Sequence, residues 1–332
     1  MHFALPGRNH RSSPFPAGSV PRAYFGRKRP LCAVVFLAIL LLIAFSRNSG
    51  DRRPEGAPHT VMILLTNKTG HSTSYINKVV ENRKEYAETH GNPLLLFLTV
   101  KESNNVQSKR SPPPINNVLG YGFFAGNVTD YPVGEAPNGW ACIPAIRHAM
   151  KEYKYSTYFW FLDQDAVIMN PSLSLEQHIL VPGRLGSIMR RGVPVVPSST
   201  VIETYKHVPP ERVQFIITQD AGGLQPGSMI IKAGPWAHYL LDAWFDPIFR
   251  NYGFQKAEQH ALEHIVQWHP TVLTKLAVIP QKIMNSYPDV PGLGGTYEDG
   301  DLLVRLKGCA EVKGRSCEKE FQKYLEKRTP SE

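Results

Sequence analysis

The sequence has 332 residues, of which 42% are hydrophobic, and this apolar content is enough for one large domain or two ordinary ones. Its formal net charge is +9, but six of the nine excess charges lie within the first thirty residues, which contain no acidic residue. This Pro- and Ser-rich leader cannot fold alone, so the charge excess does not indicate a nucleic-acid partner for the rest of the chain. The six basic residues are Arg8, Arg11, Arg22, Arg27, Lys28 and Arg29.

A run without polar residues, LCAVVFLAILLLIAF, follows the leader at residues 31–45. A core helix would show polar gaps, and a cleaved signal peptide would show a short basic region and a small-x-small cleavage site; the sequence has neither feature. Basic residues precede the run and a mixed flank follows it, which favours a cytoplasmic N-terminus. We predict a disordered basic cytoplasmic tail at 1–30, a single transmembrane signal anchor at 31–46 and a polar stem at 47–58. The short span suits the thin membranes of the early secretory pathway.

The chain after about residue 58 is then expected in the lumen. Two N-glycosylation triplets, at Asn67 and Asn127, fit that compartment. Cys309 and Cys317 bracket a short polar loop, so a disulfide between them is expected in an oxidising lumen. Cys142 lies alone inside a helical pattern and is expected to be a buried small hydrophobe, with no role that the sequence reveals. The cysteine spacings do not resemble a zinc site.

Two apolar runs, VMILLTN (61–67) and PLLLFLTV (93–100), are typical of strands buried on both faces. Between them, apolar residues recur at helical spacing from Ile76 to Ala87, and Ser72, Thr73 or Ser74 can cap that helix. Residues 102–117 have the composition of a surface loop or linker.

A second helical pattern, from Trp140 to Tyr153, leads directly into the apolar run YFWFL at 158–162. Strands that alternate with helices predict an α/β fold with a parallel sheet. In such sheets, ligands bind outside the carboxyl ends of the strands.

Asp163 and Asp165 stand at the carboxyl end of the YFWFL strand. In an extended backbone their side chains point to the same side while Gln164 turns away, and two carboxylates converging on one point suit Mg²⁺ or Mn²⁺. A solvated turn at the strand end is the plain alternative. A haloacid dehalogenase-type phosphatase, with Asp163 as nucleophile and EDGD (298–301) as its late acidic motif, is a second one. That fold places its motif on the first strand of the core, whereas two strand–helix units precede Asp163.

Six segments in order resemble glycosyltransferase family 34, the fungal and plant α-galactosyl-, α-mannosyl- and xylosyltransferases, from about residue 60 to Cys317. The sequences of these segments are most similar to those of the fungal Golgi α-1,6-mannosyltransferase subunits that extend mannan backbones. The segments are ENRKEYAETHG (81–91), IPAIRHAM in the Trp140 helix, FWFLDQDAVIMN (159–170), TQDAGGLQPGSMIIK (218–232), EQHAL from Glu258 and PQKIMNSYP (280–288).

The resemblance implies a GT-A fold, which is Rossmann-like with a mainly parallel sheet flanked by helices, at residues 59–320, followed by a C-terminal tail at 321–332. It also implies a single-pass type II protein of the Golgi membrane, a sugar-nucleotide donor, Mn²⁺ (or Mg²⁺) and retention of anomeric configuration. The expected function is transfer of mannose from GDP-mannose in α-1,6 linkage to mannan or N-glycan acceptors, together with other mannosyltransferase subunits. An α-1,2-galactosyltransferase using UDP-galactose and a non-catalytic subunit of a mannan polymerase are the alternatives.

The resemblance assigns Asp163 and Asp165 to the metal and, through it, to the donor phosphates. Thr66, at the end of the first strand, is expected to meet the nucleotide, although a helix-entry turn would explain it equally well. A glycan on Asn67 would crowd the same loop, so we expect glycosylation of Asn127 in preference to Asn67.

The glycine-rich segment after Thr218 is expected to approach the donor closely. Asp220 is a candidate for hydrogen bonds to sugar hydroxyls, and Gln225, Gly227 and Ser228 are assigned to donor binding; an ordinary loop is the alternative. Relatives commonly read LNAGS where this chain reads LQPGS, and this difference bears on the choice of sugar.

The resemblance places Glu258 and Gln259 near the reacting sugar. The Gln259 amide cannot act as a strong base, but it can stabilise an oxocarbenium-like transition state while the leaving phosphate takes the acceptor's proton. An acid such as Glu258 at a helix N-terminus is often only a partner of the helix dipole.

The chain departs from the family at GDLLVRLKGC, where Arg305 stands in place of a metal-ligating His. Arginine cannot ligate a cation but can pair with a diphosphate, and Lys307 adds positive charge. Either Arg305 replaces part of the metal's charge, or the chain binds donor poorly and serves mainly as a partner subunit.

Overall fold

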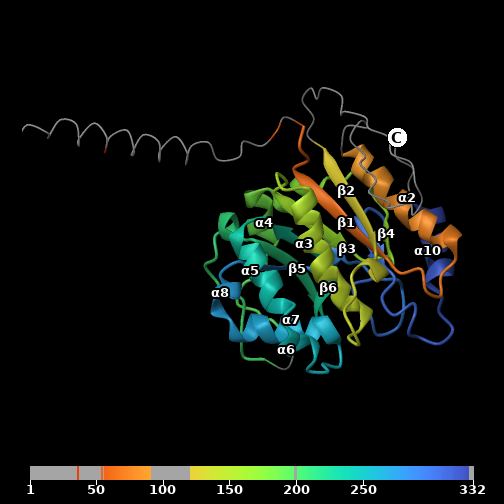
Figure 1. Ribbon diagram of the computed structural model, residues 1–332. Helices are drawn as coiled ribbons and strands as arrows, with labels where there is room; N and C mark the ends of the chain where they lie inside the picture. The colour runs from red at the N-terminus through yellow and green to blue at the C-terminus, as the bar shows by residue number, and fades with distance from the viewer. Residues whose placement is uncertain (1–35, 37–53, 55, 91–119, 198–199, 329–332) are drawn as a thin grey trace, which may run out of the picture. The chain divides into compact units, whose positions relative to one another are not determined.

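The computed structural model describes residues 36, 54, 56–90, 120–197 and 200–328 of the chain (Figure 1). The chain divides into two units, residues 1–52 and 53–332, and of the first unit only Phe36 is described. The predicted tail, membrane span and most of the stem therefore lie outside the described residues, as do the strand predicted at 93–100 and the loop at 102–117. No helix within the described ranges is long and apolar enough to cross a membrane.

Among the described residues of the second unit, six strands form the central sheet, in the order β2-β1-β3-β6-β5-β7 (Figure 1). β1 is parallel to β2 and β3, and β5 is parallel to β7. The fold is therefore mixed α/β with a mainly parallel sheet. The strands are β1 Thr60–Thr66, β2 Tyr121–Asn127, β3 Tyr158–Leu162, β5 Phe215–Asp220, β6 Gly223–Lys232 and β7 Leu276–Ile279.

Strand β6 departs from the predicted parallel arrangement, because it is antiparallel to both of its neighbours, β3 and β5. The cause is local: only Ala221 and Gly222 separate β5 from β6, and so short a connection can form only an antiparallel hairpin. As a result, the second half of β6, Ser228–Lys232, pairs with β3, and Ser228 lies opposite Leu162 at the end of β3.

Strand β2 is not predicted from the sequence, since YGFFAGN contains two glycines and no continuous apolar run. It nevertheless pairs in parallel with the whole of β1, from Tyr121 opposite Thr60 to Asn127 opposite Thr66. A Cβ on Gly122 would lie 2.8 Å from the ring of Tyr153. Close packing against that ring explains a glycine that interrupts the apolar pattern.

The sheet is buried on both faces. Alternate residues of β1 enter two different hydrophobic clusters: Val61, Ile63 and Leu65 pack in one, and Met62 and Leu64 pack in the other. This alternation follows from the two-residue period of a strand, and it explains why the strand reads as an unbroken apolar run.

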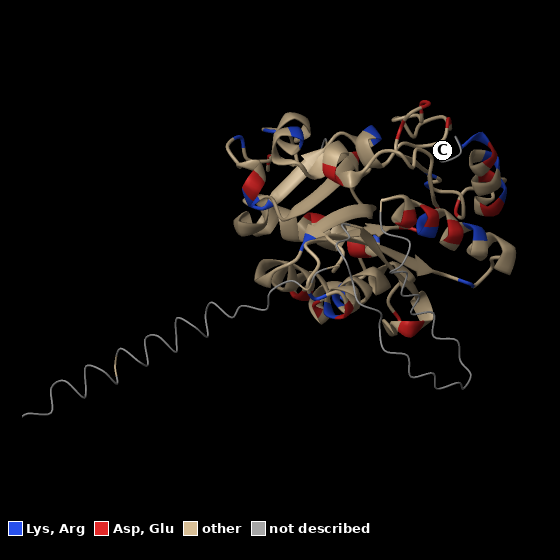
Figure 2. Cartoon of the chain, turned by 90° about the horizontal axis from the view of Figure 1, so that it is seen from above, with Lys and Arg blue, Asp and Glu red and all other residues tan. Residues whose placement is uncertain are grey.

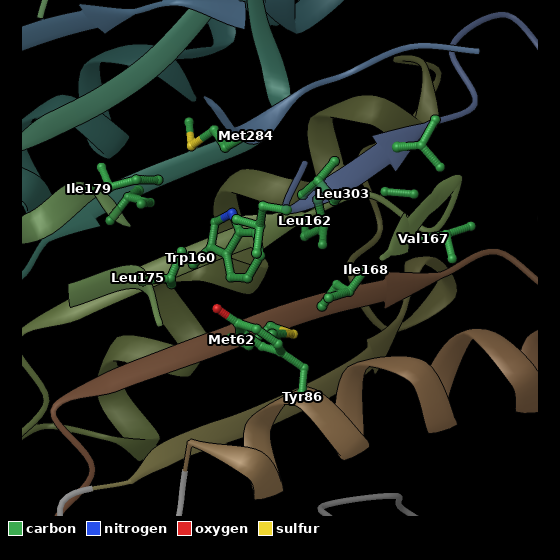
Figure 3. Packing of buried hydrophobic residues seen from close by; sticks show 14 of the residues in the cluster. Met62, Tyr86, Trp160, Leu162, Val167, Ile168, Leu175, Ile179, Met284 and Leu303 are labelled. Carbon is green, nitrogen blue, oxygen red and sulfur yellow. The ribbon is translucent and has the colours of Figure 1, made fainter. Parts of the chain in front are cut away.

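Helices cover both faces of the sheet (Figure 1). In Figure 3, Met62 of β1 and Trp160 of β3 lie beside Tyr86 of α2, whose ring centroid is 5.8 Å from that of Trp160. Helix α2 is capped by Ser72, whose Oγ accepts a hydrogen bond from the backbone N–H of Tyr75. The helices on the Ile63 face are α3 Cys142–Glu152, α5 Pro235–Trp244 and α7 Ala257–Trp268; those on the Met62 face are α2 Thr73–Thr89, α4 Pro182–Ile188 and α10 Cys317–Lys327.

A separate two-stranded sheet joins β4 Ala166–Ile168 to β8 Leu303–Arg305 in antiparallel register, with Ala166 opposite Arg305. Shortly after β8, Cys309 and Cys317 form a disulfide, and α10 begins at Cys317. Because α10 buries Phe321 completely, the folded domain continues past residue 320, where the sequence placed its end and the start of a tail.

Shorter helices complete the described chain: η1 Val128–Asp130, η2 Asn138–Ala141, η3 Glu176–Leu180, η4 Pro210–Arg212, α6 Pro247–Arg250, α8 Pro270–Leu273 and α9 Gln281–Met284. Cys142, at the start of α3, is a free and buried thiol. Figure 2 shows basic and acidic residues interspersed on the same helices, so charges of one sign are not gathered into a single stripe in this view.

Candidate functional site

The segment Asp163–Asp165, the aspartate turn, forms a turn between β3 and β4 and not the extended backbone that the sequence predicted. The Asp163 N–H donates to the Gly227 carbonyl at 2.8 Å, and the Asp165 carbonyl accepts from the Leu306 N–H at 2.7 Å. The turn is thus held between β6 and the end of β8. Both carboxylates face the guanidinium of Arg305, whereas the sequence predicted that they face a bound metal ion.

Arg305 uses all three nitrogens of its guanidinium within the site. Nη2 lies 2.6 Å from Asp163 Oδ2, Nε lies 3.5 Å from Asp165 Oδ1, and Nη1 donates to Gln225 Oε1 at 3.3 Å. Only 13% of the Arg305 side chain is exposed, compared with 33% for Asp163 and 25% for Asp165. Arg305 was predicted to face a diphosphate, but in the structure it pairs with the two aspartates.

The charges of this cluster influence one another. Burial alone would lower the pKa of Arg305, but the carboxylates of Asp163 and Asp165 outweigh burial and raise it, so the guanidinium stays charged. Partial burial raises the pKa of Asp163 to about 7; Asp165 and Glu258 add to the rise, and Arg305 opposes it.

The expected Mn²⁺ or Mg²⁺ depends on free carboxylates at Asp163 and Asp165. In the structure a cation of the chain itself, the Arg305 guanidinium, is paired with both. A divalent ion would have to displace it, so the residues as arranged do not fit a two-carboxylate metal site. Within the described ranges, no group of three His, Cys, Asp or Glu side chains is placed to hold a metal ion.

Gly227 makes this packing feasible. A Cβ at this position would overlap both the Arg305 guanidinium and the Asp163 carboxylate. The backbone φ of Gly227 is not in the left-handed region, so the reason for glycine here is space and not conformation. Gly227 was expected to permit the close approach of a sugar-nucleotide donor. In the structure the group that lies close to Gly227 is the guanidinium of Arg305.

A second buried acid, Asp220, organises the tip of the β5–β6 hairpin. Its Oδ1 accepts from the Gly222 N–H at 2.7 Å and from Gln225 Nε2 at 3.0 Å, while its Oδ2 accepts from the Tyr287 hydroxyl at 2.9 Å and from Lys307 Nζ. With four donors and only 5% exposure, this carboxylate positions the hairpin and Lys307 and is not open to a sugar hydroxyl.

Gln259 joins the same network from α7. Its Nε2 donates to the Gly222 carbonyl at 2.9 Å and to Glu263 Oε1 at 3.0 Å. The same carbonyl accepts from Lys256 Nζ at 2.6 Å. A continuous chain of contacts therefore runs from Asp163 through Arg305, Gln225 and Asp220 to Gln259. It brings together residues from the turn after β3, from β5, β6 and β8, and from α7.

Glu258 stands in the first turn of α7, with its carboxylate packed so closely on Gly139 that a Cβ there would overlap it. Burial raises the pKa of Glu258, and Glu258 in turn contributes to the raised pKa of Asp163. The preceding residue, Ala257, has a φ of 41°, which costs energy for any residue with a side chain and often marks a functional segment.

The remaining predicted residues lie at the margin of this network or inside the core. Thr66 is buried at the end of β1 and donates its hydroxyl to the Gly126 carbonyl at 3.1 Å. The Asn67 N–H donates to Gln164 Oε1 at 2.6 Å, so the first sequon touches the aspartate turn. Ser228 is fully buried, and its hydroxyl oxygen accepts a hydrogen bond from Trp160 Nε1 at 3.2 Å. The Ser228 hydroxyl therefore lies in the core and is not available to a sugar nucleotide.

Asn127, the other sequon asparagine, ends β2 and caps η1. Its Oδ1 accepts from the backbone N–H of Thr129 at 3.0 Å and from the Thr129 hydroxyl at 2.9 Å. The hydrogen bonds of its side chain stay within its own turn and do not involve the aspartate turn.

Asn82 and Arg83 of α2 are part of the site although no role was predicted for them. Asn82 exchanges two hydrogen bonds with the backbone of Ile168, and Arg83 donates to the carbonyls of Asp163 and Ala166. A signal was present in the sequence: both polar residues share the helical face of buried Val79, so they occupy core positions of an amphipathic helix. Polar groups at core positions need buried partners, which here are the backbone of β4 and the aspartate turn.

Taken together, the site is a hydrogen-bonded set of acids, amides and cations at the carboxyl ends of β1 and β3. Its exposed part consists of the Asp163 and Asp165 carboxylates and the cations Lys256 and Lys307. Such an edge of an α/β sheet is where ligands bind, and cations beside hydrogen-bonding amides suit a phosphate-containing ligand.

The chain was compared with known proteins. Residues 56–317 match the galactosyl transferase GMA12/MNN10 family. The chain is 32% identical over 279 residues to an uncharacterized α-1,2-galactosyltransferase of Schizosaccharomyces pombe, across 82% of this chain and 76% of that protein. It is 30% identical over 289 residues to the probable α-1,6-mannosyltransferase MNN10 of Saccharomyces cerevisiae, across 80% of this chain and 65% of that protein. It is 29% identical over 256 residues to an α-1,2-galactosyltransferase of Schizosaccharomyces pombe, of which it spans 60%.

Among solved structures, the chain aligns with a glycosyltransferase involved in the glycosylation of the major capsid of PBCV-1. The TM-score is 0.49 and the sequence identity is 12%, and the alignment covers 80% of this chain and 99% of the other.

Proposed function

The chain belongs to the galactosyl transferase GMA12/MNN10 family, and on that premise we propose that it transfers mannose from GDP-mannose in α-1,6 linkage to a mannan or N-glycan acceptor. The family indicated by the six sequence segments is thereby confirmed. One observation supports a donor site in this chain: Asp163, Gln225, Arg305 and Gln259 come from four separate parts of the fold and meet in one hydrogen-bonded network at the carboxyl end of β3.

The proposed chemistry assigns the donor diphosphate to the cationic side of the network. Lys307 and Lys256 would neutralise the negative charge that develops on the departing nucleoside diphosphate. The N–H groups of Arg305 that are not bonded to the aspartates would contribute to the same neutralisation.

Gln259 is proposed to act at the anomeric carbon. Its Nε2 is fixed by Gly222 and Glu263, so the orientation of the amide is set before the donor binds. The amide oxygen would stabilise positive charge on the sugar as the bond from the anomeric carbon to the phosphate oxygen breaks. The acceptor hydroxyl forms the new bond on the same face, which retains the configuration, and its proton passes to the leaving phosphate oxygen.

Transfer of galactose from UDP-galactose in α-1,2 linkage is the second candidate. The observation in its favour is that the relative with 32% identity is named as an α-1,2-galactosyltransferase, while MNN10, with 30% identity, is named as a probable α-1,6-mannosyltransferase. One of the two residues that distinguish the chain within its glycine-rich segment, Gln225, is held by Arg305 and Asp220 and belongs to the donor side of the network.

The test uses the full-length protein in detergent with an α-1,6-mannooligosaccharide acceptor and either GDP-mannose or UDP-galactose. We expect a product one mannose longer, with an α-1,6 linkage by methylation analysis, and loss of that product in Gln259→Ala. Transfer from UDP-galactose alone would replace the mannosyl proposal with the galactosyl one. Full turnover by Gln259→Ala would remove the role assigned to that amide.

The setting that we propose is the Golgi membrane, with the second unit in the lumen and with other mannosyltransferase subunits as partners. The apolar run at 31–45 and the two sequons support this setting, and so do two relatives named as probable α-1,6-mannosyltransferases, MNN10 and MNN11 of Saccharomyces cerevisiae. If the purified chain binds neither donor but restores activity to a partner subunit on mixing, it is a non-catalytic subunit.

A further inference from the structure

The guanidinium of Arg305 stands where two neighbouring carboxylates would otherwise hold a cation. Nη2 is 2.6 Å from Asp163 Oδ2, and Nε is 3.5 Å from Asp165 Oδ1. The Asp163 contact is a short charge-assisted hydrogen bond. The Asp165 contact is an ion pair without a hydrogen bond, since both Asp165 Oδ1 and Arg305 Nε are buried and lack a hydrogen-bond partner. One positive charge is shared between two negative ones.

The backbone fixes this position of the guanidinium. Arg305 lies directly opposite Ala166 in the β4–β8 pair, and its N–H donates to the Ser286 carbonyl at 2.7 Å. The next residue, Leu306, donates to the carbonyl of Asp165. Backbone hydrogen bonds thus attach β8, which carries Arg305, to the turn that carries the aspartates. The backbone therefore places the guanidinium next to the carboxylates.

Neighbouring residues are shaped around the guanidinium in this place. Gly227 has no side chain, and a Cβ at this position would occupy the space that Arg305 and Asp163 fill. Gln225 accepts from Nη1 with its Oε1 at 3.3 Å, and its own Nε2 is anchored to Asp220 Oδ1 at 3.0 Å. A side chain that merely covered the site from solvent would not need a glycine and an oriented amide around it.

We propose that Arg305 is the resident cation of the Asp163–Asp165 pair and competes directly with divalent metal ions for these two carboxylates. A metal ion placed between them would lie within a few ångströms of the guanidinium, and two cations at that distance in a partly buried site repel each other strongly. The wild-type chain therefore binds Mn²⁺ weakly at this pair, and removal of the guanidinium exposes a latent metal site.

The experiment measures Mn²⁺ binding alone, without donor, acceptor or turnover. Full-length protein in detergent is titrated with Mn²⁺, and the free ion is followed by its six-line electron paramagnetic resonance signal. We expect weak binding by the wild type and one site with affinity about tenfold higher or more in Arg305→Gln. In the double variant Arg305→Gln with Asp163→Asn, that gain is expected to disappear, because the second change removes one of the two carboxylates.

The matched control is Arg147→Gln, which removes an arginine from an ion pair with a single carboxylate, that of Asp242 on the protein surface. It should leave Mn²⁺ binding as in the wild type. Arg305→Lys keeps a positive charge at the site and is expected to bind Mn²⁺ more weakly than Arg305→Gln. Far-ultraviolet circular dichroism of each variant checks that the fold is retained.

Two results would overturn the proposal. One is tight, one-to-one Mn²⁺ binding by the wild type that is lost in Asp163→Asn, since the metal would then displace the arginine without difficulty. The other is a gain in Arg305→Gln that persists in the double variant, since the new site would then lie elsewhere. The wild-type titration needs no variant of Arg305, so it can refute the proposal even if Arg305→Gln does not fold. Because no sugar is transferred in these titrations, failure of the transferase proposal would show separately.

Discussion

The guanidinium of Arg83 donates through Nη2 to the backbone carbonyl of Ala166 at 2.5 Å and to that of Asp163 at 3.1 Å. The fully buried Arg83 side chain of α2 thus binds the backbone of the aspartate turn, while Arg305 binds the carboxylates of the same turn. Burial lowers the pKa of Arg83 to about 10, which still leaves it charged at neutral pH. The turn is held by one arginine through its backbone and by another through its side chains.

Replacement of Arg83 by Gln should destabilise the fold, because the shorter neutral side chain leaves the two carbonyls without their donor. We expect a loss of about 2–4 kcal/mol in the free energy of unfolding, the range for removing a buried charged hydrogen-bonding group. Urea unfolding measures it, and the neighbouring Lys84→Gln, at a half-exposed position paired with Glu88, is the control. Equal stability of the two variants would show that the turn does not depend on Arg83.

Gly227→Ala tests the space that the site requires. The added methyl group would overlap Arg305 and Asp163, so the guanidinium must move and the contact network must break. We expect sugar transfer to fall by a factor of about 100, the cost of about 3 kcal/mol for misplacing a charged group. The control is Gly183→Ala in α4, where a Cβ would meet no atom within 4 Å and where alanine should stabilise the helix by about 0.5–1 kcal/mol. Unchanged transfer by Gly227→Ala would separate the network from catalysis.

The sequence predicts the local elements of this fold better than their pairing. β1 and β3 are unbroken apolar runs, and α2 and α3 have helical periodicity, so each can be recognised from its own residues. β2 cannot, because Gly122 meets a packing need that depends on Tyr153. The reversed direction of β6 becomes clear only once its hairpin with β5 is known.

The same division applies to the site. The aspartates could be placed at a strand end from sequence alone, and the resemblance added Gln259 and Arg305. Their arrangement depends on contacts between distant positions: 142 residues separate Asp163 from Arg305, and the antiparallel pairing of β4 with β8 brings them together. No local pattern encodes that pairing. The resemblance therefore identified Arg305 as unusual, but only the fold reveals that it pairs with the carboxylates.

The disulfide between Cys309 and Cys317 should stabilise the segment that follows β8. It closes a loop with a sequence separation of 8, for which chain entropy predicts a contribution of about 2.5 kcal/mol. The double variant Cys309→Ser with Cys317→Ser should therefore unfold at lower urea concentration. Wild-type protein in reductant should match the variant, and the variant should not respond to reductant. A variant as stable as the oxidised wild type would mean that Arg315, which bonds to the Lys307 carbonyl at 2.6 Å and pairs with Glu320, is sufficient to hold the loop.

Asn127 should carry a glycan far more often than Asn67 when the chain passes through the secretory pathway. The backbone N–H of Asn67 donates to Gln164, between the two aspartates, so a glycan there would crowd the site, whereas the Asn127 side chain bonds only within its own turn. Enzymatic release of glycans in ¹⁸O-water followed by peptide mass spectrometry gives the occupancy of each site. Asn127→Gln should remove most of the glycan mass and Asn67→Gln little of it. High occupancy at Asn67 would contradict the prediction.

Glu176, in η3, supplies a pH-dependent part of the stability. Its Oε1 accepts from the Thr60 hydroxyl at 2.8 Å, its Oε2 accepts from the Tyr121 hydroxyl, and His59 Nδ1 lies 3.6 Å away. Burial alone would raise the pKa of Glu176, but the hydrogen bonds from His59, Tyr121 and Thr60 outweigh it and lower the pKa below the ordinary value of 4.5. The ionised carboxylate thus fastens η3 to the first residues of β1 and β2.

A lowered pKa in the folded state has a definite sign for stability. The stabilisation by Glu176 is fully present above the unfolded pKa of 4.5, and it is lost as the pH falls through the folded value. Glu176→Gln, which mimics the protonated acid, should cost about 1 kcal/mol at pH 7 and progressively less below pH 4. Urea unfolding of both proteins from pH 7 to pH 3 measures this convergence, with exposed Glu81→Gln in α2 as control. A difference that stays constant over the whole range would mean that the hydrogen bonds, and not the charge of Glu176, hold η3 to the sheet.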